Sequence, residues 1–113
     1  MKITQPYEIR YYERINGRCP FVLWREELRD PMTRARIMKR LVRLEHGNFG
    51  DCKPLKNAGG LYELRLDFGP GYRVYFGLDG HVAVIILCGG DKRSQEGDIR
   101  QAVHYWNDYC ERK

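Results

Sequence analysis

The sequence predicts an α+β fold in which helices pack against one mainly antiparallel sheet. Three observations predict this class: a strand pattern near the N-terminus, two helical patterns after it, and three consecutive strand patterns that lead into a final helix. The 113 residues suffice for one hydrophobic core but are too few for two ordinary domains. We therefore expect a single domain over residues 1–113.

The first strand is predicted from Tyr7 to Ile15, where aromatic and β-branched side chains alternate with charged ones. Asn16-Gly17 ends this pattern. Pro20 fits the first turn of a short helix, because an amide hydrogen at that position has no partner within the helix. One face of this helix gathers its large apolar side chains, Phe21, Trp24 and Leu28.

A second helix is predicted from Pro31 to about His46, with Asp30 as its N-cap and Gly47 ending it. Helical spacing relates Met32, Ala35, Met38, Leu41, Val42 and Glu45. Five cations occupy much of the remaining surface: Arg34, Arg36, Lys39, Arg40 and Arg43. We expect the two helices to form a hairpin with a basic outer face.

Residues 48–60 show no periodicity and are predicted to form a loop that carries Lys53 and Lys56. The segment from Leu61 to Phe68 then alternates apolar and charged residues as a strand does. Gly69-Pro70-Gly71 turns the chain into the next predicted strand, Tyr72 to Phe76.

The last two elements follow a hairpin signal. Asp79-Gly80 suits a type I′ turn, which predicts that the third and fourth strands are antiparallel neighbours. The fourth strand, Val82 to Cys88, is apolar throughout, as expected of a strand covered on both faces. A final helix begins near Ser94. Its predicted buried stripe is Ile99, Ala102, Val103, Trp106 and Cys110.

A tight turn at residues 69–71 predicts the pairing of the two strands that it joins. Phe68 would lie opposite Tyr72, Asp67 opposite Arg73, and Arg65 opposite Tyr75. One face would then gather charged residues and a tyrosine: Glu63, Arg65, Asp67, Arg73 and Tyr75. The structural interpretation is a cross-strand Asp67–Arg73 ion pair with Arg65 stacked on Tyr75. The functional interpretation is that the two arginines hold a phosphate.

Lys92 and Arg93 follow Gly89-Gly90-Asp91, between the last predicted strand and the final helix. Backbone amides and a helix N-terminus at such a sheet end can bind an anion. The alternative is a solvated loop with two ordinary charges. No phosphate-loop or dinucleotide-binding glycine motif is present, so a nucleotide cofactor gains no support.

Composition limits the class of protein. The 20 Lys and Arg against 15 Asp and Glu give a net charge of +5, which favours anionic partners. The four cysteines show no CxxC spacing and the three histidines are scattered, so no metal site is predicted. We expect reduced thiols and a cytoplasmic location, since no secretory leader is evident; a disulfide framework is the alternative. No apolar run is long enough to cross a membrane.

Three stretches together resemble the RelE/ParE superfamily of bacterial toxin-antitoxin modules. Residues 60–66 read GLYELRL, residues 71–76 read GYRVYF, and an apolar strand then runs into GGDK at residues 89–92. The closing stretch is similar to the subgroup called addiction-module killer proteins. The positions that carry this second likeness are Lys92 to Gln95, Asp98, Ile99, Ala102, Tyr105, Trp106 and Tyr109. The resemblance covers nearly the whole chain and implies a RelE-like fold.

In the RNA-cleaving members, basic residues on the sheet grip mRNA in the ribosomal decoding site and assist attack of a 2′-hydroxyl on the next phosphate. Carried over by position, the resemblance implies this role for Arg65, Arg73 and Lys92. Glu63 stands where the best-known RNA-cleaving relative has a lysine, and Asp98 near where it has a tyrosine. We interpret Glu63 as a candidate base, with Asp98 or Tyr75 assisting. Additional RNA contacts are expected from Lys53, Lys56, Tyr75 and Arg93.

Three functions are compatible with this resemblance. The first is a ribosome-dependent mRNA endonuclease that uses no metal or cofactor and is neutralised by a cognate antitoxin carrying a helix-turn-helix domain. The second is a ParE-like toxin that targets gyrase and has no nuclease activity. The third is a non-catalytic nucleic-acid-binding accessory domain. The fold alone does not choose among them.

Overall fold

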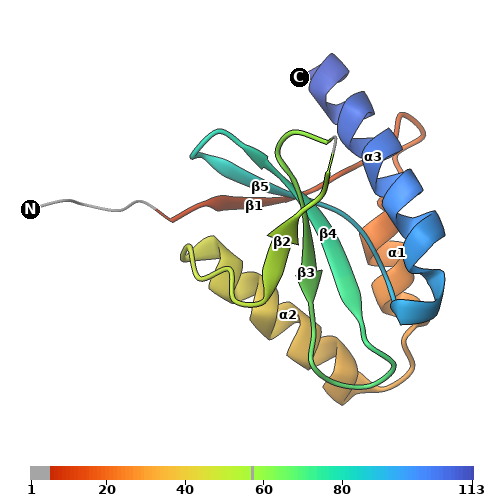
Figure 1. Cartoon of the computed structure of the whole chain (residues 1–113). Coiled ribbons are helices and arrows are strands. Elements are labelled where there is room, and N and C mark those ends of the chain that lie inside the picture. Colours follow the sequence, from red (N-terminus) through yellow and green to blue (C-terminus); the bar gives the residue numbers. More distant parts are fainter. Residues whose placement is uncertain (1–5, 57) are drawn as a thin grey trace, which may run out of the picture.

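The computed structural model describes residues 6–56 and 58–113; residues 1–5 and 57 of the predicted domain lie outside this range. One five-stranded sheet has the order β1-β5-β4-β3-β2 (Figure 1). β1 is parallel to β5, and the other neighbours are antiparallel. The elements are β1 (Glu8–Tyr11), α1 (Pro20–Glu27), α2 (Pro31–Glu45), β2 (Cys52–Pro54), β3 (Leu61–Arg65), β4 (Arg73–Asp79), β5 (Ala83–Gly90), a 3-10 turn η1 (Lys92–Ser94) and α3 (Gln95–Arg112).

Helices cover both faces of this sheet, as Figure 1 shows. On one face, apolar side chains of β3, β4 and β5 pack against α1 and α2 around Phe21, Ile37 and Leu64. On the other face, α3 packs its Ala102 and Trp106 against a second apolar cluster. The predicted α+β class, N-terminal strand, helical hairpin, three consecutive strands and C-terminal helix are confirmed. The first strand is shorter than predicted because it ends at Tyr11.

The ends of α2 follow the sequence signals, but its buried face does not. Asp30 accepts a hydrogen bond from the Met32 amide at 3.1 Å, as an N-cap should. The buried side chains are Ile37, Leu41 and Leu44, whereas Met32 and Val42 are exposed. The predicted stripe was therefore rotated around the helix. Ile37, Leu41 and Leu44 also have helical spacing, so periodicity alone could not separate the two stripes.

The predicted loop at residues 48–60 contains a short strand. β2 pairs antiparallel with β3 and places Lys53 opposite Glu63. A strand of three residues is too short to show alternation, and Pro54 argues against a central strand. At the edge of a sheet, however, proline is tolerated because one side of the strand needs no partner.

The pairing between β3 and β4 differs from the prediction by two residues. Arg65 lies opposite Arg73, and Glu63 lies opposite Tyr75, so the predicted Asp67–Arg73 pair is wrong. The connection is wider than a tight turn: the Leu66 amide donates to the Tyr72 carbonyl at 2.9 Å. A shift of two residues preserves the face of every side chain, because side chains alternate with a period of two. The predicted charged face therefore survives the error in register.

Other details also depart from the sequence patterns. Asp79 pairs with Ala83, so three residues join β4 to β5 rather than the two of a type I′ turn. In α3, Tyr105 is buried and Cys110 is exposed, the reverse of the predicted stripe at these two positions. The four cysteines are free thiols, as expected.

Candidate functional site

The site lies where β3 ends and β4 begins. Arg65 and Arg73 are direct cross-strand partners, so their side chains leave neighbouring strands on the same face. Arg65 and Arg73 have 39% and 13% of their side chains exposed, respectively. Together with Lys92 they line a hollow of about 170 Å³. Three cations predicted from separate parts of the sequence thus meet at one place.

Gly71 brings Lys92 to the two arginines. A Cβ at this position would lie 3.3 Å from Lys92 Cβ and 3.5 Å from Arg73 Nη1, and its φ of +82° favours glycine. The Gly71 carbonyl also accepts a hydrogen bond of 3.1 Å from Arg73 Nη1. The turn before β4 therefore orients Arg73 and admits the η1 segment beside it.

Glu63 lies behind the cations with no exposed surface. Its Oε1 is 3.4 Å from Arg65 Nε and 4.0 Å from Lys53 Nζ, and its Oε2 is 3.5 Å from Arg73 Nε. A buried carboxylate needs such partners, because burying a charge without them is costly. The arrangement fits Glu63 as an anchor for the arginines. Its burial separates it from solvent and from the hollow, which it does not line.

Two neutral side chains complete the cluster around Glu63. Tyr75 is fully buried and its hydroxyl donates to Glu63 Oε2 at 3.3 Å. Burial, and then the neighbouring Glu63 charge, raise the pKa of Tyr75. Gln95 donates to the same oxygen at 2.7 Å. Tyr75 was expected to project away from the core with the arginines, and the burial of this face by α3 explains why it does not.

Gln95 is the residue that the sequence reasoning missed. Its position continues the helical spacing of Ile99, Ala102 and Trp106 toward the start of α3. A glutamine on an otherwise apolar stripe indicates a buried polar partner, because an unpaired buried amide is costly. This signal was present in the sequence, but only the fold identifies Glu63 as the partner.

One donor in the cluster is unused. Among the described residues, Arg73 Nε is buried without a hydrogen-bond partner, although Glu63 Oε2 lies 3.5 Å away as an ion-pair partner. A buried donor left unpaired costs about 1–3 kcal/mol. Native proteins keep few such groups, and for this one the charge of Glu63 is a nearby partner that lies slightly beyond good hydrogen-bond distance.

Asp98 lies apart from the hollow. It accepts a hydrogen bond from Ser94, and its side chain occupies the space beside Gly90. Burial raises the pKa of Asp98, the Ser94 hydrogen bond opposes this rise, and the Asp91 charge adds to it. Burial, and then Asp98, raise the pKa of the nearby Cys88 thiol to about 12.

The remaining predicted RNA contacts are distributed around the site. Lys53 reaches Glu63, whereas Lys56 and Arg93 are exposed and do not line the hollow. In the part of the chain that the structure describes, no three His, Cys, Asp or Glu side chains gather as metal ligands would. None of the described helices is long and apolar enough to span a membrane.

The sequence has relatives that place it in a family. Residues 27–102 match the family described as phage derived protein Gp49-like (DUF891). An uncharacterized protein of Haemophilus influenzae is 48% identical over 82 residues, which cover 73% of this chain and 81% of the relative. The chain belongs to the Gp49-like family.

The fold of this Gp49-like chain is that of a known toxin. It matches the free-state structure of a double arginine-to-alanine mutant of the E. coli toxin RelE with a TM-score of 0.67. The match covers 88% of the chain and 97% of RelE at 21% identity. The predicted RelE-like fold is confirmed, and the family and the fold together support the resemblance to the RelE/ParE superfamily.

Proposed function

We propose that this Gp49-like protein is the toxin of a toxin-antitoxin module and cleaves mRNA on the ribosome. The observation that carries the proposal is the convergence of Arg65, Arg73 and Lys92 on one hollow. Arginine and lysine remain charged at neutral pH, and guanidinium groups match the oxygens of a phosphate. Partly enclosed cations stabilise developing phosphate charge more strongly than exposed ones do.

The proposed reaction is transfer of the phosphodiester to its own 2′-hydroxyl. The 2′ oxygen forms a bond to phosphorus as the bond to the 5′ oxygen breaks. The proton leaves the 2′-hydroxyl, and the departing 5′ oxygen gains a proton. The products are a 2′,3′-cyclic phosphate and a 5′-hydroxyl, and no metal-bound water is required. The three cations would bind the scissile phosphate and offset the charge that develops on its oxygens.

Glu63 has two proposed roles, and its surroundings favour one of them. As a general base it would need to reach the 2′-hydroxyl, yet its carboxylate is buried and already engaged by five side chains. As a positioning residue it would hold Arg65 and Arg73 at the hollow. We favour the positioning role. Tyr75 is equally buried and donates to Glu63, and Asp98 lies apart from the hollow, so we propose no proton-transfer role for either.

The main test is Arg73→Ala, expressed at the same level as the wild type. Growth inhibition should be lost, and mRNA cleavage should fall by about 10²–10³-fold, the effect of removing one donor to a transition-state oxyanion. Arg65→Ala and Lys92→Ala should have smaller effects because each is more exposed than Arg73. The matched control is Arg18→Ala, which removes an exposed arginine outside the hollow.

Mapping of mRNA ends separates this function from its alternatives. Cyclic phosphate ends that appear on induction and disappear in Arg73→Ala would support the endonuclease. Intact mRNA together with inhibition of supercoiling by purified protein would move the assignment to a gyrase-directed toxin. Toxicity equal to wild type in Arg73→Ala would contradict the proposed site.

A cognate antitoxin is the expected partner, and we propose that it carries a helix-turn-helix domain and covers the basic surface. The net charge of +5 favours an acidic or amphipathic inhibitory segment. Co-expression with the adjacent reading frame should restore growth, and the two proteins should co-purify. Action on mRNA and ribosomes would place the protein in the cytoplasm.

A further inference from the structure

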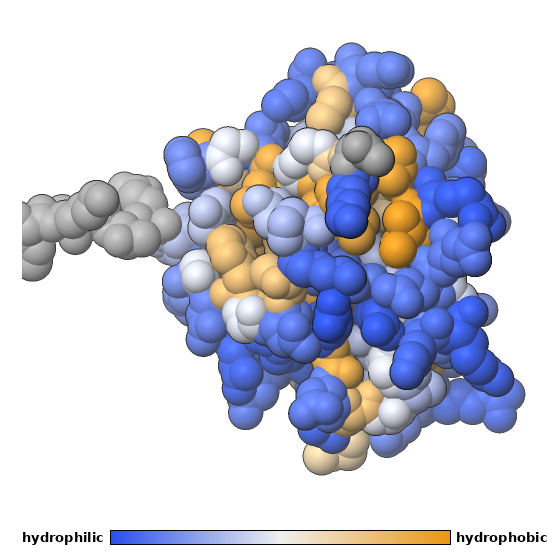
Figure 2. Space-filling model, viewed as in Figure 1, coloured by the Kyte–Doolittle hydropathy of each residue, from blue (hydrophilic) through white to orange (hydrophobic). Residues whose placement is uncertain are grey.

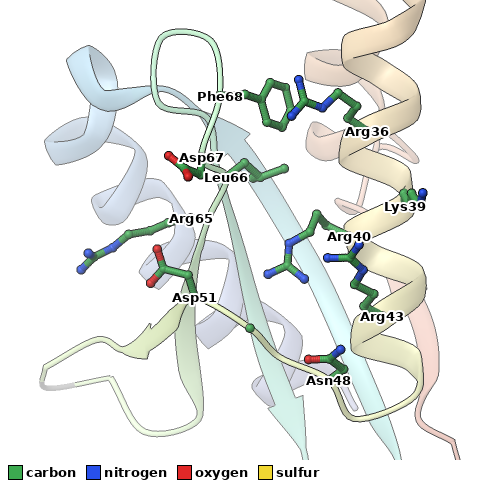
Figure 3. Close-up of a pocket in the computed structure, with 11 residues that line it drawn as sticks. Arg36, Lys39, Arg40, Arg43, Asn48, Asp51, Arg65, Leu66, Asp67 and Phe68 are labelled. Atoms are coloured by element: carbon green, nitrogen blue, oxygen red, sulfur yellow. The ribbon is translucent and has the colours of Figure 1, made fainter.

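A larger groove adjoins the proposed catalytic hollow. It has a volume of about 530 Å³ and lies between α2 and the end of β3 (Figure 3). Its lining includes five cations and two carboxylates: Arg36, Lys39, Arg40, Arg43, Arg65, Asp51 and Asp67. We refer to this space as the α2 groove. Figure 2 shows mostly hydrophilic side chains on the surface in the view of Figure 1, with smaller apolar areas between them.

We propose that the α2 groove binds the backbone of the RNA strand that flanks the scissile phosphate. This inference rests on the proposed function, because it concerns the path of the same substrate. The α2 groove and the catalytic hollow share the lining residues Asp51, Arg65, Leu66 and Asp67. A strand bound in the hollow can therefore continue into the groove around the end of β3.

The cations of α2 are spaced for successive phosphates. Arg36, Lys39, Arg40 and Arg43 lie three, four and seven positions apart, which places them along one side of the helix. From Arg36 to Arg43 the helix rises about 10 Å. Nucleotides in a stacked strand rise roughly 3.4 Å each, so this length corresponds to about three nucleotides.

The four α2 cations share the groove with two carboxylates, Asp51 and Asp67, but do not pair with them. None of the four α2 cations forms an ion pair with a carboxylate within the described residues. Burial, and then the neighbouring Arg43, lower the pKa of Arg40. A polyanion would relieve this repulsion. Arg40 also donates to the Phe49 carbonyl at 3.2 Å, which fixes its guanidinium at the groove.

The rest of the lining favours RNA over an acidic peptide. The Arg36 guanidinium lies 3.9 Å from the centre of the Phe68 ring, and an arginine plane or an aromatic ring can stack with a base. Asp51 and Asp67 would repel phosphates, but carboxylates accept hydrogen bonds from base amino groups and 2′-hydroxyls. In Figure 3, Arg36 and Arg40 reach from α2 toward β3, whereas Arg65 points to the other side. The two ends of the proposed path therefore lie on opposite sides of the β3 end.

The test uses the double variant Lys39→Gln/Arg43→Gln. Both side chains are exposed, and neither makes a hydrogen bond or ion pair within the described residues, so the fold should persist. The probes are single-stranded RNAs of about four and about twelve nucleotides, methylated at the 2′ oxygen of the cleavage position so that binding alone is measured. The matched control is Arg18→Gln/Arg29→Gln, which removes two exposed arginines that line neither the α2 groove nor the catalytic hollow.

The expected result is a loss that depends on RNA length. The double variant should bind the longer RNA roughly tenfold more weakly, and its slope of log affinity against log salt should fall by about 1.4, or about 0.7 for each lost phosphate contact. Binding of the short RNA should not change, and the control should match the wild type on both. Thermal denaturation of each variant checks that the fold is retained.

Other outcomes would overturn the inference. Unchanged binding of the longer RNA, or equal weakening of both RNAs, would contradict a flanking subsite. Loss of antitoxin binding with RNA binding intact would assign the groove to an acidic protein segment instead. If wild-type protein cleaves mRNA and the double variant binds the longer RNA normally, the proposal for the α2 groove is wrong and the proposed function stands. If wild-type protein produces no cleavage, the proposed function fails.

Discussion

Two neighbouring residues of β3, Glu63 and Leu64, are buried on opposite faces of the sheet, one among charged side chains and the other among apolar ones. Leu64 and Glu63 have no exposed surface, and they point to opposite sides of the sheet. Leu64 packs in the apolar cluster beneath α1 and α2. Glu63 is held by Arg65, Arg73 and polar neighbours on the α3 side. Around β3, the side facing α1 and α2 is therefore apolar, whereas the α3 side carries the Glu63 charge cluster beside a second apolar cluster. A change at Glu63 can alter the charged site without touching the cluster around Leu64.

The α3 face also changes character along its length. At one end, Gly77 leaves no room for a Cβ beneath the Trp106 ring, so helix and sheet meet closely. At the other end, Arg65 and Arg73 keep part of their surface exposed. The helix therefore closes the sheet only partway, and the uncovered end of the strands holds the candidate site.

Leu64→Ala should have the largest effect on stability. The substitution leaves a cavity in a fully buried apolar cluster, so we expect a loss of about 3 kcal/mol in the free energy of unfolding. Cleavage by the remaining folded protein should be close to wild type, because the charged face is untouched. Urea denaturation measures the first quantity, and cleavage per folded molecule measures the second. A specific loss of activity in the folded fraction would break the separation between the two faces.

Glu63→Gln tests the charged side of β3, because it removes the charge with almost no change in volume. We expect a loss of about 2 kcal/mol in unfolding free energy, since the hydrogen bonds and ion pairs to a charged acceptor are weakened. Cleavage should fall more than the folded fraction does, because Arg65 and Arg73 lose their anchor. Urea denaturation and mRNA cleavage should be measured on the same preparation.

The pH dependence of Glu63→Gln separates its two proposed roles. If Glu63 only positions the arginines, the substitution should lower the cleavage rate at every pH and leave the shape of the pH–rate profile unchanged. If Glu63 is a general base, the substitution should remove the rising limb of the profile. Retention of full activity would contradict both roles.

The strand pattern of β3 and β4 determines which features of the site the sequence could predict. Alternation along residues 61–76 was enough to place Glu63, Arg65, Arg73 and Tyr75 on one face, because an error of two residues in register leaves the faces unchanged. The register itself depended on the wide connection between Leu66 and Tyr72, which no local pattern specifies. The burial of Tyr75 and the contact between Gln95 and Glu63 depend on where α3 packs against the sheet. Long-range packing therefore determines the register, the burial and this contact, which periodicity alone could not predict.

Tyr75→Phe should have a smaller effect than either substitution on β3. It removes the hydroxyl that donates to Glu63 at 3.3 Å while keeping the buried ring, so the expected loss is about 1 kcal/mol. The raised pKa of Tyr75 adds a test in alkali. The unfolded tyrosine ionises near pH 10 while the folded one keeps its proton, so wild-type stability should fall as pH rises above about 10. Part of this decline should be absent from Tyr75→Phe. Identical alkaline declines in the two proteins would contradict the buried hydroxyl.

Asp98→Asn should have the smallest effect, because this carboxylate remains partly exposed and solvent screens its charge. Burial raises the pKa of Asp98 in the folded protein, so folding favours its protonated form. That contribution to stability is present at acidic pH and is lost as pH rises from about 4 through the folded pKa. Asp98→Asn should therefore match the wild type near pH 3 and gain stability relative to it toward neutrality, while its amide oxygen can still accept from Ser94. Thermal unfolding across this pH range measures the difference. A wild type that becomes the more stable protein at neutral pH would show that the Ser94 hydrogen bond outweighs burial, and a changed pH–rate profile for cleavage would instead implicate Asp98 in proton transfer.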